Sequence, residues 1–163
     1  MLRIYKNHSA KFDNPQDLKN YCFGGRGVVT LENPKTKIHH TYHIKKPRNE
    51  DEFPDDVYFI YAVHMMGDTN KCFYIGMIER GKFRLTRASR FDRHHAIVKG
   101  AHYLMQMMEN PGAFIKMNVY HEGMCSVCGR PLTSPASLKR GVGPRCWAYL
   151  KDTLPWKQPN PDG

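Results

Sequence analysis

The sequence lacks an apolar run long enough to cross a membrane. A transmembrane helix needs roughly 18 consecutive apolar residues, and no stretch of the 163-residue chain approaches that length. Residues 1–15 also lack an apolar run of signal-peptide length. We therefore expect a cytoplasmic protein, built as one domain or as one domain with a small appendage.

Several catalytic signatures are also missing. The chain contains no G-x-x-x-x-G-K-[ST] phosphate loop, no G-x-S-x-G nucleophile turn and no H-E-x-x-H metal motif. Gly24-Gly25-Arg26-Gly27 is too short to indicate a phosphate loop, and no paired-carboxylate arrangement is evident. These absences favour a binding protein over an enzyme.

Acidic residues are scarce. The chain has 15 Asp and Glu against 25 Lys and Arg, which gives a formal net charge of +10. A positive net charge of this size attracts polyanionic partners. It indicates what the protein associates with and does not indicate its fold. The simpler reading is a soluble basic protein, so the positions of the charges must decide between the two.

Cysteines are few and odd in number. Of the five, Cys22 and Cys72 stand alone, while Cys125, Cys128 and Cys146 lie close together in the sequence. A cytoplasmic location keeps thiols reduced, so the clustered cysteines indicate metal binding before a disulfide. We expect Cys22 and Cys72 to be buried thiols, since a free cysteine behaves as a small hydrophobic residue.

Residues 28–86 have the pattern of consecutive short strands. Apolar residues alternate over 38–44, dominate 57–65 and recur over 72–79 and 82–86, with turn residues at 67–70 and 80–81. Residues 93–110 then have helical spacing, with Asp92 as the expected N-cap and Asn110-Pro111-Gly112 as the stop. A strand at 114–120 follows. We predict an α+β fold: an antiparallel β-meander with one main helix, then a small zinc-finger unit.

The C-terminal third has the spacing of a zinc site. Cys125 and Cys128 form a C-x-x-C turn followed by Gly129, which is how a zinc knuckle presents two thiolates. Cys146 adds a third, which leaves a tetrahedral structural site one ligand short. His121, four residues before Cys125, is the nearest candidate. We predict one structural Zn²⁺ held by His121, Cys125, Cys128 and Cys146.

Two short helices are expected around the third cysteine. Ser134 is a suitable N-cap with Pro135 at the first helical position, and Gly141 is a suitable end. Gly143-Pro144 then begins a second helix with Cys146 in its first turn, where backbone amides stabilise a thiolate. The predicted division is an α+β domain over 1–120, a zinc-binding unit over 121–155 and a tail over 156–163.

An open fourth position is the alternative to a histidine ligand. A water molecule there would suggest catalysis, and three-cysteine hydrolytic sites place a Glu near that water. Glu122 is the nearest carboxylate, and its spacing differs from the deaminase pattern.

Residues 121–146 resemble a family of unknown function common in bacteriophage genomes. Its pattern is H-x-G-x-C-x-x-C-G-R-x-L-T-x-P-x-S-x-x-x-G-x-G-P-x-C. The matching residues are His121, Gly123, Cys125, Cys128, Gly129, Arg130, Leu132, Thr133, Pro135, Ser137, Gly141, Gly143, Pro144 and Cys146. The resemblance extends loosely to residues 73–76 and the helix from residue 94. It implies a zinc-binding, treble-clef-like protein of phage origin in the cytoplasm of the infected bacterium, and no settled activity.

Basic residues gather in two stretches. Residues 80–99 contain a single acid, Asp92, and residues 124–151 contain none. Arginine suits bidentate phosphate contacts, so both stretches together predict a surface that follows a phosphate backbone. The expected contact residues are Lys82, Arg84, Arg87, Arg90, Arg93, Arg130, Lys139, Arg140 and Arg145. The simpler alternative is a solvated face on each element.

Aromatic residues and histidines offer further candidates. Rings on the strands or after the last cysteine could stack on unpaired bases, although most strand aromatics belong to a core. The candidate rings are Tyr58, Phe59, Tyr61, Phe73, Tyr74, Trp147 and Trp156. Two histidine clusters could form a second metal site or a catalytic pair, although surface positions are the simpler interpretation. Their members are His39, His40, His43, His94 and His95.

The leading hypothesis is a zinc protein that binds DNA or RNA through backbone phosphates without strong sequence preference. A protein-interaction module that docks on an acidic host or phage protein is the alternative, because basic surfaces suit acidic proteins equally well. A metal-dependent nuclease is the weaker third candidate.

Overall fold

The computed structural model describes residues 10–54, 56–66 and 69–153. The predicted tail over 156–163 therefore lies outside the described residues. The elements are α1 (Pro15–Cys22), β1 (Arg26–Glu32), β2 (His39–Lys45), η2 (Glu50–Glu52), β3 (Val57–Met66), β4 (Thr69–Glu79), β5 (Lys82–Arg84), α2 (Ala96–Glu109), α3 (Pro111–Phe114), β6 (Asn118–His121), α4 (Pro135–Arg140) and α5 (Pro144–Thr153).

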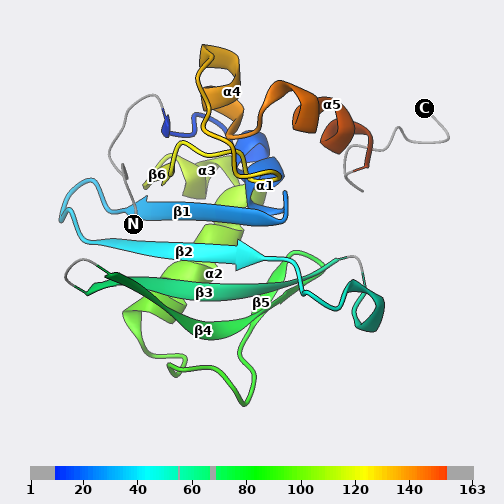
Figure 1. Ribbon diagram of the computed structural model, residues 1–163. Coiled ribbons are helices and arrows are strands. Elements are labelled where there is room, and N and C mark those ends of the chain that lie inside the picture. The colour runs from blue at the N-terminus through cyan, green and yellow to red at the C-terminus, as the bar shows by residue number, and fades with distance from the viewer. Residues whose placement is uncertain (1–9, 55, 67–68, 154–163) are drawn as a thin grey trace, which may run out of the picture.

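The strands form one curled antiparallel sheet in the order β5-β4-β3-β2-β1-β6 (Figure 1). The first five strands neighbour one another in chain order, as the predicted meander requires. The chain then passes behind the sheet as α2 and returns to pair β6 with the free edge of β1. The predicted α+β class with one main helix is confirmed.

The main core lies between α2 and the sheet. One face of α2 is buried over its whole length, from Ile97 to Met108, and it packs against strand residues such as Tyr42 and Ile60. The Tyr42 hydroxyl also donates a 2.7 Å hydrogen bond to the Ile97 carbonyl. This bond gives the buried hydroxyl a partner. Without one, the buried polar group would destabilise the fold. The helix is thereby fixed at its first turn as well as along its apolar face.

The N-terminal helix α1 was not predicted. The Asn14 side chain accepts a 2.8 Å hydrogen bond from the Asp17 N–H, and Pro15 occupies the first turn. Leu18 and Tyr21 are completely buried. The Tyr21 hydroxyl donates to the Val28 carbonyl and accepts from the Val28 N–H. A single ring therefore ties α1 to the start of β1.

The start of the main helix and the start of the strand that follows it differ from the prediction. The main helix begins at Ala96, and its N-cap is His95, whose Nδ1 accepts a hydrogen bond from the Ile97 N–H. Asp92 caps the preceding turn instead, by accepting from the His94 N–H. Asn110 ends the helix as expected, and it also caps the short α3. The strand predicted at 114–120 begins only at Asn118, because α3 and a turn precede it.

The two isolated cysteines have different environments. Cys22 is buried, as predicted, whereas Cys72 is exposed on β4, so the prediction for Cys72 was wrong. It pairs with Val63 across the sheet, on the face opposite α2. Within the described residues, no helix has the length and apolarity that a membrane span requires.

Candidate metal centre

Three thiols converge in the C-terminal unit. The Sγ atoms of Cys125, Cys128 and Cys146 all lie within 4.8 Å of one another. A Zn–S bond is about 2.3 Å long, so thiolates around one tetrahedral ion approach one another to roughly 3.8 Å. The observed cluster is close to that spacing, and these cysteines can hold a thiophilic metal ion.

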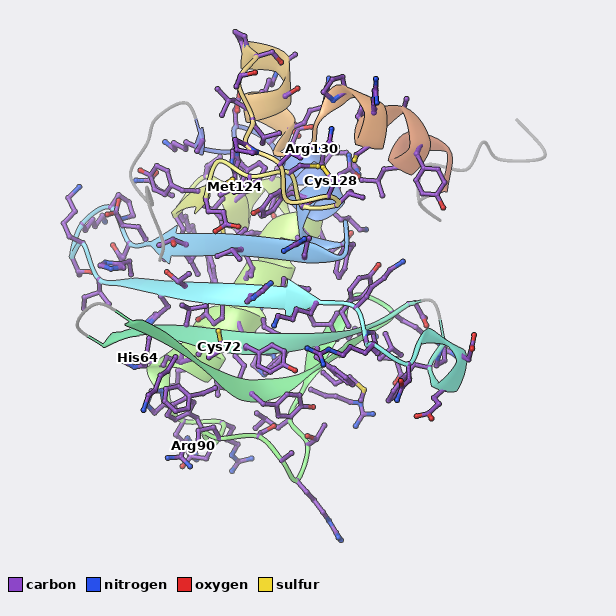
Figure 2. All side chains as sticks on the ribbon, in the orientation of Figure 1. His64, Cys72, Arg90, Met124, Cys128 and Arg130 are labelled. Carbon is purple, nitrogen blue, oxygen red and sulfur yellow. The ribbon has the colours of Figure 1, made fainter. Side chains whose placement is uncertain are left out.

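The first two thiols come from a tight hairpin. Cys125 donates its N–H to the Arg130 carbonyl at 2.8 Å and accepts at its own carbonyl from the Gly129 N–H at 2.9 Å. A further hydrogen bond from the Leu132 N–H to the Gly123 carbonyl closes the hairpin. Figure 2 shows Cys128 and Arg130 at the top of the molecule, near α4 and α5. The knuckle predicted from the C-x-x-C-Gly pattern is present.

Two helices complete the centre. Ser134 caps α4, Pro135 begins it, and Gly141 ends it with φ of 73°. The Gly141 carbonyl accepts a 3.1 Å hydrogen bond from the Ser126 N–H, which joins the end of α4 to the knuckle. Cys146 lies in the first turn of α5. The local structure therefore agrees with the expected helix signals.

The thiols differ in their electrostatic environment. Burial raises the pKa of Cys125, but the N–H groups of Cys128, Gly143 and Val127 outweigh it and lower the pKa below its ordinary value. The Gly143 N–H lies 3.4 Å from the Cys125 Sγ. For Cys146, burial and the two adjacent thiols raise the pKa to about 12. Hence the backbone stabilises the Cys125 thiolate, whereas a Cys146 thiolate would need a bound cation to offset its repulsion by the other thiolates.

Both ring nitrogens of His121, the predicted fourth ligand, have backbone partners. Its Nδ1 accepts a 2.9 Å hydrogen bond from the Gly123 N–H, and its Nε2 donates to the Leu138 carbonyl. With these partners, Nδ1 accepts a hydrogen bond and Nε2 carries the proton. Burial also lowers the pKa of the ring, in keeping with a neutral imidazole. His121 is not one of the residues that form the thiol cluster, so its ligand role stays a prediction. Its ring packs against Phe12 and Tyr21 at centroid distances of 5.2 and 5.4 Å.

The unit is joined tightly to the N-terminal part of the sheet. The Arg26 N–H donates a 2.9 Å hydrogen bond to the Ser126 carbonyl, and α4 contacts α1. A small apolar cluster of Cys125, Val142 and Leu150 lies apart from the main core. The division into two units at residue 120 stays a prediction, since the metal unit has its own small core but shares this backbone contact with β1.

Residues 117–151 match DUF6011, a family of unknown function. This DUF6011 segment comprises β6, the knuckle, α4 and nearly all of α5, so it covers the metal centre and leaves most of the chain outside the match. No curated protein and no solved structure is significantly similar to the chain. The comparisons thus support the cysteine unit and assign it no activity.

The structure separates the two predicted basic groups. Lys82 and Arg84 lie on β5, at one edge of the sheet, while the DUF6011 segment begins at β6, on the other edge. Five strand spacings of about 4.8 Å separate these edges. Figure 2 shows the separation, with Arg90 at one end of the molecule and Arg130 at the other. The nine predicted contact residues therefore form two surfaces rather than one.

The group near β5 is the more open of the two. Its side chains are all exposed, and they are Lys82, Arg84, Arg87, Arg90 and Arg93. We call them the β5 basic edge. In the other group, Arg140 lies over the Trp147 ring and Lys139 is 3.9 Å from Asp13, while Arg130 and Arg145 are exposed.

The histidine clusters are only partly brought together. His39, His40 and His64 line a pocket of about 220 Å³ between β2, β3 and the start of α2. Burial is the main cause of a lowered pKa for His40, and the adjacent histidines lower it further. In the described residues, the cysteines form the one group of three metal-ligating side chains with ligand atoms that close together.

Proposed function

We propose that the protein binds nucleic acid through phosphate contacts with little sequence specificity. The β5 basic edge carries the proposal. Five exposed cations follow one another over residues 82–93, and the one acid of that stretch, Asp92, is engaged by the His94 N–H. Arg84 is also 3.6 Å from Glu79, but both side chains are about half exposed. Such an exposed pair contributes little, so the cation stays available to a phosphate.

The separation of the two basic groups changes the proposed contact surface. The β5 basic edge is the primary contact, and Arg130 and Arg145 are a second contact for a strand that crosses the sheet. Because phosphate contacts carry no sequence information, the proposal includes no base preference.

Zn²⁺ is the proposed occupant of the cysteine centre. Three thiolates form a donor set that suits zinc, and a structural zinc ion contributes its binding free energy directly to folding. When bound, the ion supplies this stability. Cys125, Cys128 and Cys146 would hold it, and the knuckle, α4 and α5 would then be fixed to one another. The resemblance to phage proteins supports a role in the cytoplasm of an infected bacterium.

A fluorescence-anisotropy titration tests the function. Zinc-loaded protein is titrated against single-stranded DNA, duplex DNA and RNA at 50 and 200 mM salt. With five phosphates contacted on a single strand, affinity should fall roughly 100-fold between these concentrations, from a slope of about −0.7 per phosphate. Lys82→Glu combined with Arg87→Glu should weaken binding and flatten this dependence.

Lys35→Glu combined with Lys116→Glu is the matched control. Both of these lysines are exposed, lie away from β5, and give the same change of net charge. If the two double variants lose affinity equally, net charge rather than the β5 basic edge governs binding. If no polymer binds at 50 mM salt, the proposal is wrong. Capture of an acidic protein from nuclease-treated lysate would then favour the protein-interaction alternative.

A further inference from the structure

A row of aromatic side chains lies on the face of the sheet opposite α2. Along β3, Tyr58, Ile60 and Ala62 are buried in the core, so Phe59 and Tyr61 point to the other face and are half-buried. Tyr74 on β4 is directly opposite Tyr61. In Figure 1 none of the described helices crosses the near face of these two strands. Phe59, Tyr61 and Tyr74 form what we call the aromatic row.

A register shift places the third ring in this row. Ile60 pairs with Gly76 and Tyr61 pairs with Tyr74, so Ile75 is an extra residue in β4. Ile75 is completely buried, which leaves Tyr74 on the open face. Without the extra residue, Ile75 would lie opposite Tyr61 on the open face, and Tyr74 would point into the core. The bulge therefore brings two tyrosines side by side on the surface.

The rings are held in place by edge contacts. The Tyr74 centroid is 5.9 Å from that of Phe59 and 5.8 Å from that of Tyr61, with the ring planes nearly perpendicular in both pairs. The Thr86 hydroxyl donates a 3.1 Å hydrogen bond to the Tyr74 hydroxyl. Rings positioned in this way lose little conformational freedom when a planar ligand stacks on them.

Cations flank the row on both sides. The Lys45 Nζ, from β2, lies over the Tyr61 ring, 5.2 Å from its centre. Burial is the main cause that raises the pKa of Tyr61, and the positive charge of Arg48 acts in the opposite direction. On the other side, the Arg84 Nη2 is 3.3 Å from the Met77 Sδ, and Met77 pairs with Phe59. The row thus lies between Lys45 and the β5 basic edge.

We propose that the aromatic row is a base-stacking platform and that the polymer bound is a single strand of nucleic acid. This inference rests on the proposed function and adds the base contact to it. Bases of a single strand are free to stack on protein rings, whereas those of a duplex already stack on one another. The phosphates of the strand contact Lys45 on one side of the row and the β5 basic edge on the other.

An abasic oligonucleotide separates base contacts from phosphate contacts without changing the protein. Zinc-loaded protein is titrated with an oligothymidine, with an abasic strand of equal length, and with a duplex, all at one salt concentration. We expect the abasic strand and the duplex to bind at least 10-fold more weakly, since each base stacked contributes roughly 5- to 150-fold. The slope of affinity against salt should be the same for the two single strands.

Variants then locate the base contact. Phe59→Leu with Tyr61→Leu should weaken oligothymidine binding at least 10-fold and leave abasic binding unchanged. Tyr61→Phe, which keeps the ring, should bind within twofold of the original protein. Tyr149→Leu is the matched control, because Tyr149 is 67 % exposed and lies on α5, far from the row. A circular-dichroism melt of each variant establishes that it is folded.

The outcomes distinguish this inference from the function on which it rests. Salt-sensitive binding that is equal for the oligothymidine and the abasic strand would overturn the platform and keep the phosphate contacts. A loss of abasic binding in the double variant would also overturn it, because the rings would then act by holding the sheet together. Absence of binding to every strand at 50 mM salt would overturn both.

Discussion

Replacing Gly141 with alanine tests how the metal unit is seated on the fold. Gly141 ends α4 in the left-handed region, with φ of 73°. A Cβ atom there would lie 2.4 Å from Cδ2 and 3.0 Å from Cε2 of Tyr21. That ring is completely buried, and its hydroxyl is bonded to both backbone groups of Val28. The ring cannot move aside without breaking these bonds, so the substitution must displace α4.

The magnitude has two contributions. An L-residue in the left-handed region costs about 1–2 kcal/mol, and overpacking a rigid interior adds about 1–3 kcal/mol. We expect a total loss of about 2–5 kcal/mol in the free energy of unfolding. Gly81→Ala is the matched control, because Gly81 has φ of 75° and a Cβ atom there would meet no other atom within 4 Å. The loss of unfolding free energy in Gly81→Ala should therefore come from the left-handed backbone alone.

The assay is urea unfolding of both variants, followed by circular dichroism at one fixed excess of zinc. Gly141→Ala should lose about 1–3 kcal/mol more than Gly81→Ala, and its melting temperature should be lower by about 2–4 °C per kcal/mol. Equal losses in the two variants would refute the contact with Tyr21 as the cause. Both variants are measured at the same excess of zinc, so that the metal concentration does not differ between them.

Three further predictions concern single side chains. Cys128→Ser should abolish stoichiometric zinc in atomic emission, whereas His121→Gln should keep one ion per chain and lower the melting temperature. Metal loss in His121→Gln would establish the predicted ligand role of the histidine. Tyr21→Phe should cost about 1–3 kcal/mol in urea unfolding, because it leaves the Val28 N–H and carbonyl unpaired. Burial and two neighbouring cations lower the pKa of His43 to about 4, so the neutral ring is favoured in the fold. Its contribution is complete above about pH 6.5 and is lost as the pH falls towards 4, by about 1–2 kcal/mol after solvent screening; His43→Gln should flatten that part of a plot of melting temperature against pH.

The metal unit was the most predictable part of the chain, because its structure is set locally. The C-x-x-C-Gly turn, the Ser134 cap and the Gly141 end each depend on neighbours a few residues away, and all are present in the structure. The prediction for His121 relied on nearness in sequence rather than on the direction of its side chain. His121 and Val119 share one face of β6, and Val119 is buried. Tyr120 is buried as well, so residues 119–121 are buried on both faces of β6 and no alternation distinguishes the imidazole.

Helix α1 has local signals in the sequence, whereas the pairing of β6 with β1 depends on contacts between distant residues. The Asn14-Pro15-x-Asp17 start and the apolar positions at Leu18, Tyr21 and Cys22 are helix signals that precede the first strand. No local signal, by contrast, specifies that β6 pairs with β1. The positions of the basic groups follow from that pairing, because it sets the two stretches on opposite edges of the sheet. Only the order of the strands in the sheet could show that the two basic stretches form two separate surfaces.

The pairing of β6 with β1 also sets an order of events during synthesis. β1 leaves the ribosome early, and the strand that covers its edge follows only after the whole meander and α2 have been made. At roughly 5–20 residues per second, this edge stays open for several seconds. An open edge is a template for pairing with other chains. Chains truncated before residue 118 keep the edge permanently bare, so loss of the C-terminal unit should produce insoluble protein rather than a shorter soluble one.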